Sequence, residues 1–295
     1  MPRTMSKRFR HAAIVGKYQA HGIRPMLEEL AHFLLGLGME VSFERETAEA
    51  TGVADFDAVP VEQLGQRCDL CVVVGGDGTM LGIARQVARQ SLPVVGINQG
   101  RLGFITDVPH GQYRDALRSM VAGDYEEEHR AMLESRVWRD GGPIFDGLSL
   151  NDVVVSRGAT ASMVELRIDI GEDFVANVRA DGLIIATPTG STAYSLSAGG
   201  PILHPEIAGW GLVPIASHML THRPIVLPDT GEIRITIVAG RNASANFDMH
   251  SIASLLHGDQ VRVRRSEHKA RFLHPPGWSY YATLRRKLRW YEGVV

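Results

Sequence analysis

The sequence predicts an α/β domain with a parallel sheet, joined to a β-rich domain of antiparallel, sandwich-like strands. Up to about residue 124, short apolar runs alternate with stretches whose apolar residues recur at helical spacing. From Tyr125 onward the apolar residues recur at every second position, as in half-buried antiparallel strands. We therefore expect residues 1–124 and 274–295 to form the α/β domain and residues 125–273 the β-rich domain.

The composition is that of an ordinary globular protein. Of the 295 residues, 44% are hydrophobic and 22% are charged, which is enough apolar material for one large or two modest cores. The formal net charge of −2 provides no positive field to attract nucleic acid or an anionic membrane. No run approaches the ~20 apolar residues of a membrane span. We expect a cytoplasmic protein with neither nucleic acid nor membrane as a partner.

The first domain reads as alternating strands and helices. Apolar residues at helical spacing begin at Ile23, and Gly38 can end that helix. Alternation of this kind predicts right-handed βαβ units with ligands bound at the carboxyl ends of the strands. The expected strands are His11–Val15, Val41–Phe43, Cys71–Val74 and Pro93–Ile97, and the expected further helices are Val61–Gln66 and Tyr113–Met120.

In the second domain, strands are predicted from the strict alternation of apolar and polar residues. Apolar and polar residues alternate over Val164–Ile170 and again over Ile233–Ile237. Glycine-containing turns separate these strands, and the tail from Tyr281 to Trp290 returns to helical spacing. The two cysteines, Cys68 and Cys71, are expected to point to opposite faces of a strand, which favours a structural role over redox or metal chemistry.

The chain is organised around a glycine-rich loop that follows a buried strand. Gly75, Gly76 and Gly78 surround Asp77, and Thr79 follows them. We expect these glycines to turn with positive φ and bring their amides against a phosphate, with Thr79 capping the next helix. A carboxylate in an anion site is unfavourable unless it binds a metal ion or accepts a proton. Asp77 therefore indicates chemistry rather than a simple Asp-Gly turn.

Two segments of this chain resemble the NAD kinase family. Gly75-Gly76-Asp77-Gly78-Thr79 is similar to a signature shared by NAD kinases, diacylglycerol and sphingosine kinases and, in a variant, 6-phosphofructokinases. The longer run Asp181–Pro201 resembles the second hallmark of bacterial NAD kinases, and the similarity extends over nearly the whole chain. The resemblance implies an ATP-dependent phosphotransferase that converts NAD to NADP.

By this resemblance Asp77 is the general base, which removes the proton from the 2′-hydroxyl of the adenosine ribose of NAD. Gly78 and its neighbours supply amides to the nucleotide, while Gly75 and Gly76 permit the turn. Thr79 completes this phosphate loop. The chain contains no lysine-bearing phosphate loop, so a triphosphate depends on backbone amides, arginines and a divalent cation, Mg²⁺ or Mn²⁺, that arrives with ATP.

The resemblance also assigns residues to NAD binding. Asn151 and Asp152 can read adenine and ribose hydroxyls, although an Asx turn before a strand is the alternative. Asp181 can accept hydrogen bonds from a carboxamide or a ribose, and Arg179 can reach a phosphate. The remaining contacts come from the Thr-Pro-Thr-Gly turn and the residues after it, a segment that otherwise reads as a helix cap: Thr192, Ala193, Tyr194, Ser195, Leu196 and Ser197.

For two further residues, Phe104 and His250, the sequence allows either NAD binding or a role without a ligand. Phe104 lies in a glycine-rich loop similar to one that places an aromatic ring near the dinucleotide, and core packing is the alternative. His250 stands where related proteins often have glutamine, so it either binds NAD or is a surface histidine. Some family members take NAD contacts from a neighbouring subunit, which implies a homodimer or homotetramer.

Two other functions compete with NAD kinase activity. A lipid kinase of the diacylglycerol or sphingosine type shares the Asp77 loop, but gives no role to the Asp181–Pro201 run. A catalytically silent NAD sensor is the other alternative, and an intact Asp77 loop argues against it. No histidine spacing typical of a protein-bound metal site occurs.

Overall fold

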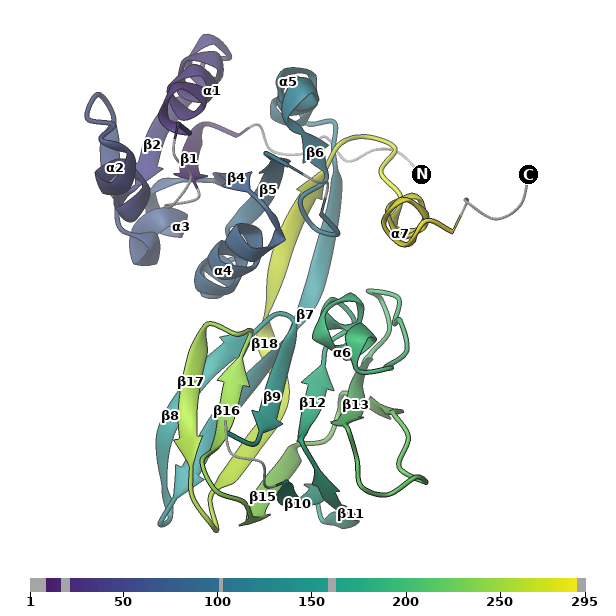
Figure 1. Cartoon of the computed structure of the whole chain (residues 1–295). Coiled ribbons are helices and arrows are strands. Elements are labelled where there is room, and N and C mark those ends of the chain that lie inside the picture. The colour runs from purple at the N-terminus through teal and green to yellow at the C-terminus, as the bar shows by residue number, and fades with distance from the viewer. Residues whose placement is uncertain (1–8, 17–21, 101–102, 159–162, 291–295) are drawn as a thin grey trace. The chain divides into compact units, whose positions relative to one another are not determined.

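The structure is a computed structural model that describes residues 9–16, 22–100, 103–158 and 163–290. The chain divides into two compact units, Met1–His129 with Ala270–Val295, and Arg130–Lys269. It passes from the first unit to the second within β7 (Glu126–Arg139) and returns within β18 (Gln260–His274). Figure 1 shows that most helices belong to the first unit and most strands to the second. The predicted fold class is confirmed.

The first unit is built on a parallel sheet. Its strand order is β3-β2-β1-β4-β5, and β5 also pairs in parallel with β6 and with the end of β18. Every residue of β4 and β5 is buried, as expected for central strands. The strands are β1 (His11–Gly16), β2 (Glu40–Glu44), β3 (Asp57–Val59), β4 (Leu70–Gly75), β5 (Pro93–Asn98) and β6 (Val108–Pro109).

The helices of the first unit include one that its sequence does not suggest. The segment α2 (Arg45–Thr51) buries only Thr47 and Ala48, so it shows no apolar periodicity. It begins because the side chain of Glu44 accepts hydrogen bonds from the amides of Glu46 and Thr47. The other helices are α1 (Arg24–Gly36), α3 (Leu64–Arg67), α4 (Asp77–Val87), α5 (Tyr113–Val121) and α7 (Tyr280–Leu288). Within the described residues, no helix is long and apolar enough to cross a membrane.

The second unit is a sandwich of two antiparallel sheets. One has the order β14-β13-β12-β9-β16-β17, and the other contains β11-β10-β15-β18 together with β7 and β8. Side chains of both sheets, such as Ile185 and Ile235, share one core, because every second residue points inward. The remaining elements are β8 (Gly142–Ser149), β9 (Asp152–Ser156), β10 (Val164–Ile170), β11 (Asp173–Ala180), β12 (Gly182–Ala186), α6 (Tyr194–Ser197), β13 (Gly209–Ile215), β14 (Ile225–Pro228), β15 (Ile233–Ala239), β16 (Ala243–Phe247) and β17 (Ser251–Leu255).

The environment of the two cysteines favours a structural role over redox or metal chemistry. Cys68 and Cys71 are buried, free thiols. Burial raises the pKa of Cys68 to about 11 and raises the pKa of Cys71 as well, so neither forms the thiolate that redox or metal chemistry requires.

Candidate active site

The glycine-rich loop lies between β4 and α4, at the carboxyl edge of the parallel sheet. β4 ends at Gly75, Gly76 precedes the helix with φ −115°, and Asp77 is the first residue of α4. Neither of these glycines nor Gly78 has a positive φ, so the expected left-handed turn is wrong. The missing side chain matters instead at Gly75, where a Cβ would lie 2.7 Å from Oγ1 of Thr79.

The helix that follows starts earlier than the sequence suggests. Thr79 is the third residue of α4 and Gly76 holds the cap position, so the expected capping role of Thr79 is wrong. Asp77 lies in the first turn, where the positive end of the helix dipole favours a negative charge. The helix therefore presents a half-buried carboxylate at the end of a central strand.

The loop after β5 surrounds this carboxylate with donors. Oδ2 of Asp77 accepts a hydrogen bond from the amide of Phe104 at 2.7 Å. Oδ1 accepts from the amides of Ile105 and Thr106 at 3.3 and 3.1 Å. The hydroxyl of Thr106 also donates to Oδ1, at 2.8 Å. These bonds tie two loops that are distant in sequence and fix the orientation of the candidate base.

Two further residues make this arrangement possible. A Cβ on Gly103 would lie 1.7 Å from Oδ1 of Asp77, so only glycine leaves room for the carboxylate. Nδ2 of Asn98 donates to the Thr106 hydroxyl at 2.8 Å, and its Oδ1 accepts from the amide of Gly100 at 2.7 Å. Neither Asn98 nor Thr106 was predicted as a site residue. Asn98 could have been found as a polar residue at the end of a buried strand, whereas no pattern in the sequence singles out Thr106.

The amide of Phe104 donates to Asp77, while the Phe104 ring faces Lys287 of the same unit. Nζ of Lys287, from α7, lies 5.4 Å from the centroid of the half-buried Phe104 ring. This distance is within the range of a cation–π contact.

In the second unit, a pair of carboxylates lies at the start of β9. Asp248 is 4% exposed, and its carboxylate accepts from the amides of Leu150, Asn151 and Asp152 at 2.7, 2.8 and 3.1 Å. Asp152 is 3% exposed. Its burial, and then the nearby charge of Asp248, raise the pKa of Asp152 to about 7. Asp152 therefore changes its charge near neutral pH.

The Thr-Pro-Thr-Gly turn packs against this start of β9. The amide of Thr187 donates to the carbonyl of Asn151 at 2.9 Å. A Cβ on Gly190 would lie 2.0 Å from that carbonyl oxygen, so the close approach requires glycine. The structure thus brings Asn151 next to the turn that leads into α6, the segment expected to bind NAD.

The residues after this turn differ in exposure. The side chain of Tyr194 is 42% exposed and Ser195 is 1% exposed. Thr192, Ala193 and Leu196 are half-buried, and Ser197 is exposed. His250 is exposed in the β16–β17 turn, where its amide donates to the carbonyl of Phe247 at 3.0 Å.

Two expected site residues lie at the other end of β12. Asp181 precedes the first residue of this five-residue strand and Thr187 follows the last. At ~3.3 Å per residue the two ends are roughly 20 Å apart. Oδ1 of Asp181 lies 2.7 Å from Nε of Arg157, as an ion pair. Nε of Arg179 lies 3.6 Å from Oε1 of Glu165. Within one chain, Asp181 is therefore not next to the turn that leads into α6.

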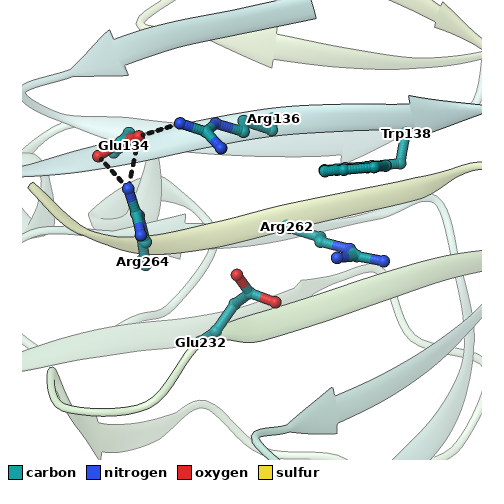
Figure 2. Close-up of a pocket in the computed structure, with 6 residues that line it drawn as sticks. All are labelled: Glu134, Arg136, Trp138, Glu232, Arg262 and Arg264. Carbon is teal, nitrogen blue, oxygen red and sulfur yellow. Dashed lines mark hydrogen bonds and ion pairs between the residues drawn. The ribbon is translucent and has the colours of Figure 1, made fainter. Parts of the chain in front are cut away.

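A hollow on the outer face of the second unit offers no comparable chemistry. Its volume is about 100 Å³, and Figure 2 shows the charged side chains that line it. Glu134 accepts from Arg136 at 3.0 Å and from Arg264 at 2.9 Å, while the Arg262 guanidinium lies 4.5 Å from the Trp138 ring centroid. The charge of Glu134 is thus engaged by two arginines.

Among its described residues, the protein has no cage of side chains for a metal ion. In the part of the chain that the structure describes, no three His, Cys, Asp or Glu side chains lie together as ligands. The Asp77 carboxylate accepts amide and hydroxyl hydrogen bonds. A cation bound here would need most of its ligands from a phosphate or from water.

The sequence matches two family models. Residues 12–125 match the ATP-NAD kinase N-terminal domain, and residues 150–275 match the ATP-NAD kinase C-terminal domain. The chain belongs to the NAD kinase family. An NAD kinase of Methylibium petroleiphilum is 63% identical over 295 residues, covering 99% of this chain and 98% of that protein. An NAD kinase of a Polaromonas species is 60% identical over 291 residues, covering 99% of this chain and all of that protein.

Two solved structures share the fold of this chain. The crystal structure of yeast NADH kinase complexed with NADH superimposes with a TM-score of 0.87 at 24% identity, over 98% of this chain and 90% of that chain. The NAD kinase from Archaeoglobus fulgidus in complex with ATP gives a TM-score of 0.76 at 26% identity, over 95% of this chain and 98% of that chain. The family resemblance inferred from the two motifs is confirmed.

Proposed function

We propose that this chain is an NAD kinase, which transfers the γ-phosphate of ATP to the 2′-hydroxyl of the adenosine ribose of NAD. The products are NADP and ADP. One observation carries the proposal: the Asp77 carboxylate is held at the start of α4, beside the carboxyl end of a central strand, in a chain 63% identical to a curated NAD kinase. In parallel α/β sheets this edge is where ligands bind.

Asp77 acts as the general base in this mechanism. The ribose 2′-oxygen attacks the γ-phosphorus, its proton passes to the Asp77 carboxylate, and the bond from the γ-phosphorus to the β–γ bridging oxygen breaks as ADP leaves. A carboxylate is a weak base for an alcohol, so the proton transfers late, as the new oxygen–phosphorus bond forms. Gly75, Gly76, Gly78 and Thr79 form the phosphate loop around it.

ATP would carry a divalent cation, Mg²⁺ or Mn²⁺, on its phosphates, and this cation would neutralise the negative charge that builds up on the transferring group. The chain's own contribution at this point is the backbone of the phosphate loop and the first turn of α4, whose amides and dipole favour anions.

We assign NAD binding to two groups of residues. One group surrounds the start of β9, where Asn151 and Asp152 meet the α6 turn, and Asp248 and His250 follow β16. In this group the residues Thr192, Ala193, Tyr194, Ser195, Leu196 and Ser197 contact the dinucleotide. Phe104, which belongs to the first unit, is assigned to NAD binding by the family resemblance alone.

The second group is Arg179 and Asp181. Because these residues lie roughly 20 Å along β12 from the first group, we propose that they serve an NAD molecule bound to a neighbouring subunit. The active protein is then a homodimer or homotetramer that acts in the cytoplasm. Sedimentation of the active enzyme tests this, and a fully active monomer contradicts it.

A coupled assay for NADP formation tests the main proposal. The wild-type protein is expected to form NADP from NAD and ATP, and Asp77→Asn to lower kcat by about 10²- to 10⁴-fold, because a general base contributes that much. Asp115→Asn, at an 89% exposed side chain in α5, is the matched control and should leave the rate unchanged.

The same assay separates the competing functions. A wild-type protein that binds NAD in calorimetry without forming NADP would identify a sensor. Phosphorylation of diacylglycerol or sphingosine in place of NAD would identify a lipid kinase. Retained NAD binding in Asp77→Asn, with the rate lost, would place Asp77 in the chemical step.

A further inference from the structure

The two oxygens of the Asp77 carboxylate accept different numbers of hydrogen bonds. Oδ1 receives three donors, the amides of Ile105 and Thr106 and the Thr106 hydroxyl, at 3.3, 3.1 and 2.8 Å. Oδ2 receives only the amide of Phe104 among the described donors, at 2.7 Å. Because a carboxylate offers about four lone-pair positions over both oxygens, Oδ1 is saturated and Oδ2 keeps room for another donor.

The direction of the Thr106 hydroxyl follows from its neighbour. A hydroxyl has one hydrogen to donate, and Nδ2 of Asn98 donates to Oγ1 of Thr106 at 2.8 Å. The amide of Gly100 donates to Oδ1 of Asn98, which turns the Nδ2 end of Asn98 toward Thr106. Thr106 therefore accepts from Asn98 and gives its own hydrogen to Asp77.

Burial and close packing hold this chain of hydrogen bonds in place. Thr106 is 0% exposed and Asn98 is 3% exposed, so water does not compete for these bonds. A Cβ on Gly96 would lie 3.0 Å from Cγ2 of Thr106, and a Cβ on Gly103 would lie 1.7 Å from Oδ1 of Asp77. Two glycines thus leave room for Thr106 and for the carboxylate.

We propose that Thr106 is a positioning residue for the phosphoryl transfer: oriented by Asn98, it makes the shortest hydrogen bond to Oδ1 of Asp77, holds the carboxylate by that oxygen and leaves Oδ2 to accept the proton of the attacking hydroxyl. The proposal rests on the proposed NAD kinase function. It deepens that function because it names the oxygen that acts as base and the side chain that selects it. A merely structural role for Thr106 would affect folding and leave catalysis in the folded protein unchanged.

The test compares Thr106→Val, which keeps the side-chain shape, with Thr106→Ser, which keeps the hydroxyl. Loss of one hydrogen bond to a charged group should lower kcat of Thr106→Val by about 10- to 100-fold. KM for NAD and for ATP should change by less than about two-fold, because the ground-state contacts remain. Thr106→Ser should restore most of the rate. Thr283→Val is the matched control, since its buried hydroxyl has no hydrogen-bond partner among the described residues.

A second variant tests the proposal should Thr106→Val fail to fold. Gly103→Ala pushes the carboxylate away from its place while φ stays outside the left-handed region, and it should lower kcat to a similar degree. Wild-type kcat in folded Thr106→Val, or a loss confined to KM, would overturn the proposal. Failure of the proposed function would look different: the wild-type protein would then form no NADP. If only the role of Thr106 is wrong, the wild-type protein still forms NADP and Asp77→Asn still lowers kcat.

Discussion

Replacing Asp152 by asparagine should stabilise the second unit at alkaline pH. Asp152 is 3% exposed, and burial together with the charge of Asp248 raises its pKa from 3.8 to about 7. In the unfolded chain its carboxyl group ionises near pH 3.9. Above neutral pH the folded protein must therefore hold a buried charge that the unfolded chain solvates freely.

The magnitude follows from linkage between protonation and folding. A group whose pKa is raised by folding contributes stability that is complete below its unfolded pKa and is lost as pH rises through its folded pKa. The pKa difference is roughly three units, which at 1.36 kcal/mol per unit amounts to about 4 kcal/mol. Asparagine does not titrate, so the advantage of Asp152→Asn should grow between pH 4 and 7 and then remain constant.

Urea denaturation at pH 5 and pH 8 measures this change. Between these values the free energy of unfolding of Asp152→Asn should gain about 2.7 kcal/mol on that of the wild-type protein, which corresponds to two pH units. Asp169→Asn is the matched control: a hydrogen bond from Arg167 lowers the pKa of Asp169, so its carboxyl group is ionised in the folded and the unfolded chain at both pH values, and the effect of this substitution should not change between them. An advantage of Asp152→Asn that is the same at both pH values would refute the reasoning.

Two further substitutions test other contacts. Gly190→Ala should lower the free energy of unfolding by about 3 kcal/mol, because its Cβ would lie 2.0 Å from a backbone oxygen. In the matched control Gly142→Ala, the Cβ meets only an ordinary contact at 3.9 Å. Thermal denaturation compares the two variants, and equal losses of stability would contradict the packing argument. For His274, burial lowers the pKa but hydrogen bonds to Asp107 and Glu128 raise it by more, so its contribution is complete below about pH 6.5 and is lost as pH rises further. His274→Gln should lower the free energy of unfolding by about 3 kcal/mol at pH 6 and by less at pH 9 in urea titrations, and an equal loss at both would count against this charged triad.

The sequence predicts the central part of the first unit well because burial leaves a direct pattern there. The apolar run of β4 is uninterrupted and the apolar positions of α4 recur at helical spacing, so both elements and their order are confirmed. The segment α2 was missed because a side chain, Glu44, starts it and its buried residues are small. The glycine conformations were also wrong, because the composition of a loop does not reveal whether glycine supplies a positive φ or merely space.

The candidate site was only partly predictable for a related reason. Asp77 and Asn151 stand out because they follow or precede apolar strands. Their partners do not, since Thr106 lies 29 residues from Asp77 and Asp248 lies 97 residues from Asn151. Such contacts arise from the way strands are ordered in a sheet, and no local spacing records them.

The passage of the chain through β7 and β18 bears on how the protein is synthesised. Arg271 and Phe272 pair with Pro93 and Val94, so a nascent polypeptide that has emerged only to residue 269 contains the whole of the second unit but leaves the beginning of β5 without this partner strand. The parallel sheet that carries Asp77 is therefore completed only after residue 272 has been translated, whereas all residues of the second unit precede it. Premature termination shortly before that codon should yield aggregation-prone fragments rather than a partly active enzyme.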